Sequence, residues 1–246
     1  MAAFLSADWR QLLMLNYAVE PRTLEPYLPR RTELDSWRGI HYLSLVGLMF
    51  LDTRVLGVAV PWYRQFEQVN LRFYVRRRVQ GEWRHGVVFI KEIVPRRTLA
   101  LAARSLFHEP YEACPMKHLV DAGFRARSPV GIVMYGWQLN GHWNQLSGVT
   151  SAPWQSPQAG SEAQFITERY WGYTARRSGG TSEIQISHVP WKICEVSCPE
   201  LACDVAVVYG SAFVEPLARP PASSFVADGA PVVVHRPTLL GQSGDL

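Results

Sequence analysis

The stretch from Glu67 to Val75 alternates strictly between two kinds of side chain, and this period of two is typical of a β-strand with differently solvated faces. One face carries Val69, Leu71, Phe73 and Val75, and the other carries Gln68, Asn70, Arg72 and Tyr74. The second face presents amides, a guanidinium and a phenol in succession, which suit the orientation of a small polar ligand. An ordinary exposed strand face with a solvated Arg72 is the alternative interpretation.

The composition favours a globular enzyme or binding protein over a nucleic-acid-binding one. The 246 residues with 48% hydrophobic content predict one domain over residues 1–236, with a disordered tail at 237–246. The net charge is only +4, and the arginines lie in short scattered clusters instead of along one aromatic-lined face. We therefore expect no nucleic-acid partner.

The N-terminal segment contains Asp8 and Arg10 where a secretory signal would need an apolar core. The longest uncharged apolar stretch, Leu43–Leu51, is far shorter than the ~20 residues of a membrane-spanning helix. These features predict a soluble cytoplasmic protein without a membrane partner.

The rest of the chain reads as strands joined by marked turns, with a few helices. Helical spacing is present at 8–19, 99–107 and 162–171, the last after a capping pattern of Ser161 and Gln164. Strands are expected at 39–51, 68–79, 86–92, 130–139, 142–149 and 183–189, with Gly81 and Asn140-Gly141 as turns. Asp228-Gly229 predicts a last hairpin. A weak helical pattern covers 199–209, within which Val205–Val208 fits a strand equally well. The fold class is therefore α+β, mainly antiparallel β, of barrel or sandwich type.

Several segments together resemble the YqjF-like uncharacterised proteins of the acetoacetate decarboxylase-like superfamily. The matching stretches are Trp9-Arg10 with Leu13, Val19–Pro29, Glu33–Asp35, Glu67–Val75, Gly86–Phe89, Pro110-Tyr111 and Glu168–Tyr173. The resemblance implies a partly closed, cone-shaped sheet with a few edge helices and a small polar pocket inside.

The resemblance also identifies a departure from the decarboxylase mechanism. In that branch a lysine forms a Schiff base, activated by an adjacent lysine that follows a proline. Here Tyr111 and Glu112 follow Pro110, and neither side chain can form an iminium. The chain has only three lysines: Lys91 is best explained by an ion pair or an edge position, Lys117 by a solvated loop, and Lys192 has no functional context.

The candidate site comprises Glu67, Arg72 and Tyr111 as catalytic residues, with Asn70, Tyr74 and Glu109 as ligand-binding residues. Arg72 would clamp an anion through its bidentate fork. Glu67 would act as the acid or base, for which burial must raise its pKa. Tyr111 would donate to an oxyanion, and Asn70 would orient the ligand. A buried structural pair of Glu67 and Arg72 is the alternative.

No cofactor or metal is expected. Cys114, Cys194, Cys198 and Cys203 have no zinc-binding spacing, and reduced, mostly buried thiols are expected. His108 beside Glu109 is better explained by helix capping than by acid–base chemistry. The chain lacks a phosphate loop, a dinucleotide fingerprint and a Gly-x-Ser-x-Gly elbow.

Two functional hypotheses follow for an uncharacterised protein with a small, anionic or carbonyl-bearing ligand. The pocket either supports a lyase, isomerase or hydrolase step without a Schiff-base lysine, or binds its ligand without turnover. A structural or regulatory role would show no enclosed polar pocket. The aromatic segment Glu168–Tyr173 is interpreted first as core, with a lid or a homo-oligomer surface as alternatives.

Overall fold

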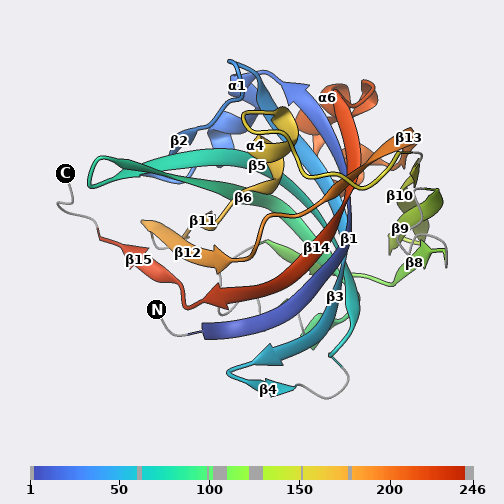
Figure 1. Cartoon of the computed structure of the whole chain (residues 1–246), viewed down its shortest axis with the longest axis horizontal. Helices are drawn as coiled ribbons and strands as arrows, with labels where there is room; N and C mark the ends of the chain where they lie inside the picture. The colour runs from blue at the N-terminus through green and yellow to red at the C-terminus, as the bar shows by residue number, and fades with distance from the viewer. Residues whose placement is uncertain are drawn as a thin grey trace.

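A computed structural model describes residues 3–59, 63–98, 100–101, 110–121, 130–150, 152–176 and 179–241. Within these residues the fold is mainly antiparallel β structure with a few short helices, as the sequence predicts. Seven strands form a ring in the order β12, β11, β6, β5, β3, β1, β14, and β14 pairs again with β12 (Figure 1). Their bounds are β1 Ala3–Val19, β3 His41–Val55, β5 Phe66–Val79, β6 Glu82–Val94, β11 Trp171–Ala175, β12 Thr181–Ser187 and β14 Ser223–His235.

A second layer covers the outside of the ring. It continues from β14 through β13 (Ile193–Ala202), β10 (His142–Thr150), β9 (Gly131–Leu139) and β8 (Met116–Val120). At Gly47 of β3 an added Cβ would lie 2.3 Å from the ring of Tyr135 in β9, so only glycine permits this close approach of the layers. The layers therefore bury a large apolar cluster that includes Leu13, Leu71 and Trp137.

Short elements complete the described structure. The helical elements are α1 Pro21–Leu24, η1 Glu25–Tyr27, α4 Glu162–Thr167, α5 Val205–Val208, η2 Ser211–Phe213 and α6 Val214–Ala218. The short strands are β2 Glu33–Leu34, β4 Val58–Ala59, β7 Tyr111–Ala113 and β15 Thr238–Leu240. No helix in the described ranges is long and apolar enough to cross a membrane.

The ring strands are buried on both faces, because a second apolar cluster occupies the inside of the ring. Met14, Val46, Tyr74 and Phe225 belong to this inner cluster. The polar face of β5 is consequently an interior face, not the solvated one of the alternative interpretation. Polar side chains on it must find partners in the protein or in a ligand.

The first segment of the chain is a strand, so the helix predicted at 8–19 is wrong. β1 lies between β3 and β14 in the ring, and both neighbours pair along most of its length. A bulge at Gln11, with φ of 57°, shifts the side-chain alternation by one residue. The apolar residues on both faces therefore imitate helical spacing, which local sequence cannot distinguish from a doubly buried strand.

The predicted hairpin at Asp228-Gly229 is also wrong. β14 runs straight through both residues, and Gly229, with φ of 78°, pairs with Arg10 of β1. A Cβ at Gly229 would lie 2.0 Å from the carbonyl oxygen of Trp9. The glycine thus serves close packing in the ring instead of a chain reversal.

The other turn signals are confirmed. Asn140 and Gly141 have φ values of 49° and 82° and join β9 to β10, while Gln80 and Gly81 join β5 to β6. The weak helical pattern at 199–209 holds for Val205–Val208, which form α5 and not the alternative strand, whereas 199–202 belong to β13. Thr238–Leu240 pairs with β12, inside the tail for which disorder is expected.

The predicted helices have mixed outcomes. α4 begins as predicted, because Ser161 accepts a hydrogen bond from the backbone of Gln164, but it ends at Thr167. The aromatic residues that follow lie in a loop and in β11, where Tyr173 is buried in the core. The helix predicted at 99–107 lies almost wholly outside the described residues.

Candidate functional site

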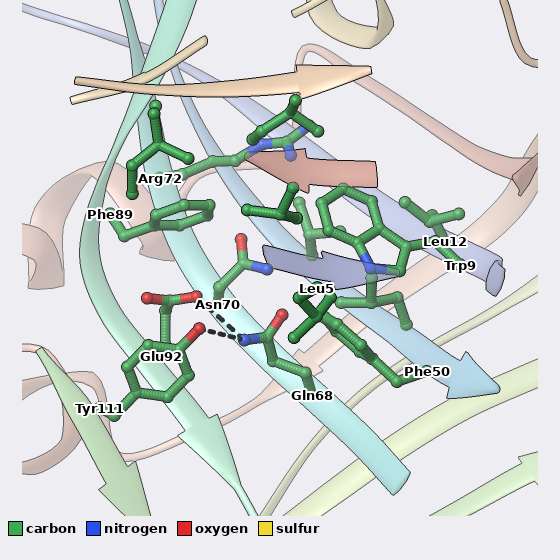
Figure 2. A pocket seen from close by; sticks show the side chains of 16 residues that line it. Leu5, Trp9, Leu12, Phe50, Gln68, Asn70, Arg72, Phe89, Glu92 and Tyr111 are labelled. Carbon is green, nitrogen blue, oxygen red and sulfur yellow. Dashed lines mark hydrogen bonds between the residues drawn. The ribbon is translucent and has the colours of Figure 1, made fainter. Parts of the chain in front are cut away.

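A cavity of about 70 Å³ lies inside the ring (Figure 2). All seven ring strands and β7 contribute residues to its wall. The polar members are Gln68, Asn70, Arg72, Glu92 and Tyr111. The remaining members include Leu5, Trp9, Leu12, Phe50, Phe89, Ile184, Ile186 and Val234. The cavity is therefore a small, mostly apolar chamber with a few convergent polar groups, which is the usual composition of a ligand site.

The polar wall comes mainly from β5, because Gln68, Asn70 and Arg72 alternate on its inner face. Successive members are about 7 Å apart along the strand. The three side chains follow one another along β5 in Figure 2. The alternation that dominates the sequence thus predicts which side chains of β5 share the face toward the cavity.

Two β-bulges place further residues in the cavity. In β6 the register with β5 shifts between Lys91 and Phe89, so Phe89 and Glu92 both face inward despite their odd spacing. In β1 the irregularity at Gln11 does the same for Trp9 and Leu12. Bulges of this kind redirect side chains and are frequent beside functional sites.

Arg72 is buried without an acidic partner. Its relative exposure is 6%, and no described residue forms an ion pair with it. Its contacts are weak: one terminal nitrogen lies 3.9 Å from the sulfur of Met14, and the guanidinium lies 5.8 Å from the Tyr74 ring centroid. Its Nε atom is buried without a hydrogen-bond partner. A buried cation in this condition is costly unless an anion accompanies it.

A hydrogen-bonded group occupies another part of the polar wall. The amide nitrogen of Gln68 donates to Glu92 at 2.9 Å and lies 3.4 Å from the Tyr111 hydroxyl. β7 pairs in parallel with β6 and sets Tyr111 opposite Glu92. Glu92 is 2% exposed, so the cavity holds a carboxylate as well as a guanidinium.

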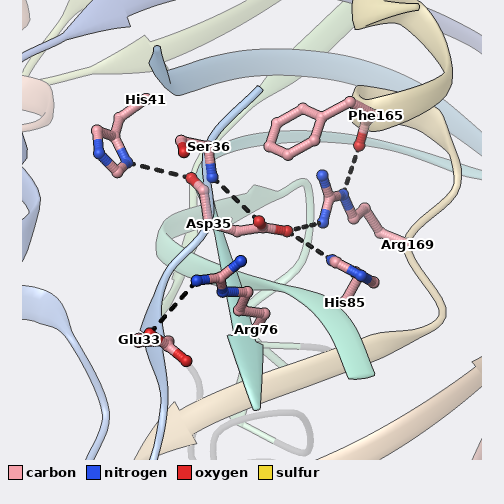
Figure 3. Close-up of polar contacts among 8 residues, drawn as sticks. All are labelled: Glu33, Asp35, Ser36, His41, Arg76, His85, Phe165 and Arg169. Carbon is pink, nitrogen blue, oxygen red and sulfur yellow. Dashed lines mark hydrogen bonds and ion pairs between the residues drawn. The ribbon is translucent and has the colours of Figure 1, made fainter. Parts of the chain in front are cut away.

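Tyr74 lies on the same face of β5 but does not line the cavity. Its hydroxyl is 2.7 Å from Ser44 Oγ, and its ring lies near both Arg72 and a second buried arginine, Arg169. Arg169 is fully paired, because Asp35 accepts from it at 2.5 Å and the carbonyl of Phe165 accepts from its Nε (Figure 3). Tyr74 therefore belongs to the support behind the site.

Asp35 connects several distant segments in Figure 3. Besides Arg169, it accepts from the backbone of Ser36 at 3.0 Å and lies 2.7 Å from His85. Burial alone would raise the pKa of Asp35, but the hydrogen bonds and charges of His85 and Arg169 outweigh it and lower that pKa. This network fixes the segment after α4 against the ring.

Glu67 lies on the outer face of β5, away from the cavity. It is 2.7 Å from His118 Nδ1 of β8. The hydrogen bond from His118 lowers the pKa of Glu67 against the opposing effect of burial. An acid or base near neutral pH needs a raised pKa, so this arrangement does not supply that role, and Glu67 forms no pair with Arg72. Because residues two positions apart share a face of a strand, the sequence already places Glu67 on the face of Val69.

None of the three lysines lines the cavity. Lys91 pairs with Glu112 at 2.6 Å and donates to the carbonyl of Val208 on the outside of the ring. Lys117 lies 4.3 Å from the Trp143 ring centroid in the outer layer. Lys192 lies at the edge of β13. Glu109 is outside the described residues, as is His108.

The described cysteines are all free thiols: Cys114 and Cys194 are buried, Cys203 is intermediate and Cys198 is exposed. Burial raises the pKa of Cys114 to about 11 and that of Cys203 to about 12, so both are unreactive. Within the described ranges no group of three His, Cys, Asp or Glu side chains is placed to hold a metal ion.

Sequence reasoning did not include Gln68, Glu92 or Trp9 in the site. Gln68 shares the face of Asn70 and Arg72 in the alternating stretch, so the sequence already predicts that it faces the cavity. Glu92 follows Lys91 and reads as half of a local ion pair, but Lys91 pairs with Glu112 instead. Trp9 reads as part of a helix. The two bulges that direct Glu92 and Trp9 inward cannot be recognised from the local sequence.

Comparison with solved structures shows the class of this fold. An acetoacetate decarboxylase from Legionella pneumophila subsp. pneumophila str. Philadelphia 1 superposes with a TM-score of 0.65 at 10% identity, covering 98% of this chain and 88% of the other. The enduracididine biosynthesis enzyme MppR, complexed with pyruvate, gives a TM-score of 0.69 at 14% identity, covering 98% and 92%. The protein has an acetoacetate decarboxylase-like fold.

Sequence comparison shows the family. Residues 6–231 match the family DUF2071, described as an uncharacterized conserved protein. The chain belongs to this family. It is 26% identical over 189 residues to the uncharacterized protein YqjF of Bacillus subtilis (strain 168), which covers 74% of this chain and 72% of that protein. The resemblance inferred from the sequence is confirmed.

Proposed function

We propose that this protein binds a small organic anion inside the ring, with Arg72 as the anchor of the anionic group. The observation that carries the proposal is Arg72, a residue only 6% exposed in a cavity wall, without an acidic partner among the described residues. A ligand carboxylate would complete its fork through paired, charge-assisted hydrogen bonds. Asn70, which neighbours Arg72 on the inner face of β5, would orient the ligand.

The size of the cavity limits the ligand to a small molecule. A volume of about 70 Å³ corresponds to roughly five or six water molecules. A protein of the same fold is known in complex with pyruvate, whose size is compatible with this volume. The apolar wall of Ile184, Ile186 and Val234 would exclude heavily hydrated multivalent anions.

Turnover is a second candidate function, and the group of Glu92, Gln68 and Tyr111 supports it. Because the cavity wall has no lysine, a Schiff base on a lysine does not enter the chemistry. A lyase, isomerase or hydrolase step would instead use Glu92 to transfer a proton and Tyr111 to stabilise an oxyanion. In this case Glu92→Gln abolishes a reaction while binding through Arg72 persists.

The experiment that tests binding is a thermal-unfolding screen with short monocarboxylates, oxo acids and dicarboxylates, followed by calorimetry. At a hundred times its Kd, a ligand stabilises by about 2.7 kcal/mol, which raises the Tm by roughly 5–10 °C. Arg72→Met should remove the shift, and Arg72→Lys should retain only part of it. Arg64→Met, which changes an exposed arginine, is the matched control.

The proposal is wrong if no anion in the panel shifts the wild-type Tm, or if Arg72→Met binds the same anion as tightly as the wild type. Folding of each variant is checked independently by its circular dichroism spectrum. Retained binding in Arg64→Met together with lost binding in Arg72→Met supports the assignment.

A further inference from the structure

The cavity contains two opposite charges that are kept apart. Arg72 and Glu92 both line it, and both are more than nine-tenths buried. Glu92 stands opposite Asn70 in the β5–β6 register, and Arg72 is two residues further along β5, about 7 Å away. Arg72 and Glu92 form no ion pair, although opposite charges attract strongly in an interior of low dielectric constant.

The supporting contacts hold each charge in its own place. The Gln68 amide donates to Glu92, and Tyr111 lies beside the same amide. Arg72 is restrained by Met14 and by the ring of Tyr74. A carboxylate has about four lone-pair sites, so Glu92 can accept several hydrogen bonds at once, that of Gln68 among them. The space between the charges therefore suits a ligand that is itself dipolar.

We propose that the ligand is a short ω-amino acid, whose carboxylate binds Arg72 and whose ammonium group binds Glu92. This inference rests on the proposed function of the same cavity and names its substrate class. The offset of two residues between Arg72 and the position of Glu92 along the sheet calls for a short methylene chain between carboxylate and amine. The apolar wall that includes Leu5, Ile184 and Val234 would pack against that chain.

Calorimetry with length-matched pairs tests the inference. Acetate, propionate and butyrate are each compared with glycine, β-alanine and γ-aminobutyrate, and γ-hydroxybutyrate is added as a neutral donor. In the wild type we expect at least tenfold tighter binding of β-alanine or γ-aminobutyrate than of the matched plain acid. Glycine should gain little, because its two charges are too close together.

The variant Glu92→Gln should reduce the amine preference to within about threefold while binding of the plain acids persists. Gln68→Leu, which removes the neutral support of Glu92, serves as the comparison at the same wall and should weaken the preference less.

The two proposals fail in different ways. If plain acids bind and depend on Arg72, but amines bind no better, the ω-amino acid inference is overturned and the anion site remains. If no acid of either kind binds, both proposals are overturned. If the amine preference persists in Glu92→Gln, another group recognises the amine and the assignment to Glu92 is wrong.

Discussion

Arg72 and Arg169 show how two buried arginines of one protein can have different roles. Both guanidinium groups lie near the ring of Tyr74, at 5.8 Å and 5.0 Å from its centroid. Arg169 is paired with Asp35, whereas Arg72 has no acidic partner among the described residues and faces a cavity. A structural arginine is stabilised by its partner, while a binding arginine keeps its charge available at a cost in stability.

This difference predicts opposite effects of the same substitution. Arg169→Met should lower the free energy of unfolding by about 3–5 kcal/mol, because it leaves Asp35 buried without its main partner. Arg72→Met should leave the stability of the ligand-free protein unchanged or raise it by about 1 kcal/mol. Urea unfolding of both variants measures these values. A large loss of stability in Arg72→Met would indicate a structural role.

Asp35 supplies a second prediction at this scale, which concerns acid stability. Its pKa is lowered in the folded protein below its usual 3.8, so its contribution is complete above that value and is lost as the pH falls through the lowered pKa. Asp35→Asn should therefore be less stable than the wild type at pH 7, and the difference should shrink below about pH 4. Unfolding free energies measured across this pH range provide the check. A difference that is independent of pH would contradict the assignment.

The residues of the site differ in how well the sequence alone predicts their positions. Asn70 and Arg72 follow from a strict period of two, because strand geometry alone fixes which side chains share a face. The same period places Glu67 on the other face, where it lies beside His118. Glu92 needs the bulge in β6, which depends on how β5 and β6 pair and not on either strand alone.

At the scale of elements, irregularities in the strands shape the site. The bulges in β1 and β6 each bring two residues that are three positions apart onto the same face of the strand. Gly229 in β14 pairs with Arg10, next to the bulge of β1. The same features made β1 resemble a helix and Gly229 resemble a hairpin turn. Positive φ values mark both turns and bulges, so only the pairing partners distinguish them.

Gly229 gives a prediction at this scale. In Gly229→Ala the new Cβ would lie 2.0 Å from the backbone oxygen of Trp9, and φ of 78° strains any side chain. We expect the free energy of unfolding to fall by more than about 2 kcal/mol. Gly141→Ala has a similar φ of 82° but open space around its Cβ, so it should cost only about 1 kcal/mol. Equal losses in the two variants would show that the close approach to Trp9 is unimportant.

At the scale of the whole molecule, the ring is closed unevenly. β1, β3 and β5 are paired over long registers, whereas β12 joins β14 through two residue pairs, Ile186 with Val234 and Ser187 with Val233. β11 likewise joins β6 through two pairs. Ile186, Val234 and Gly172 at these two junctions line the cavity, so opening there would admit a ligand.

Amide hydrogen exchange tests this expectation. Short registers open locally at lower free energy than long ones, so β11 and β12 should exchange faster than β1, β3 and β5. A bound ligand should slow exchange selectively in β11 and β12, because residues of both strands line the cavity in the closed ring. Uniform slowing over the whole sheet would indicate general stabilisation without gating at these strands.

The sequence by itself determined the class of fold, the turns at Gly81 and Asn140-Gly141, and the face of β5 that carries Asn70 and Arg72. These are local properties, since side-chain period and backbone conformational preference act over a few residues. Only the tertiary structure decided that β1 is a strand, that Arg72 lacks a described acidic partner, and that Glu92 shares its cavity. Those facts depend on which strands pair and where their registers slip, and residues distant in the chain set both.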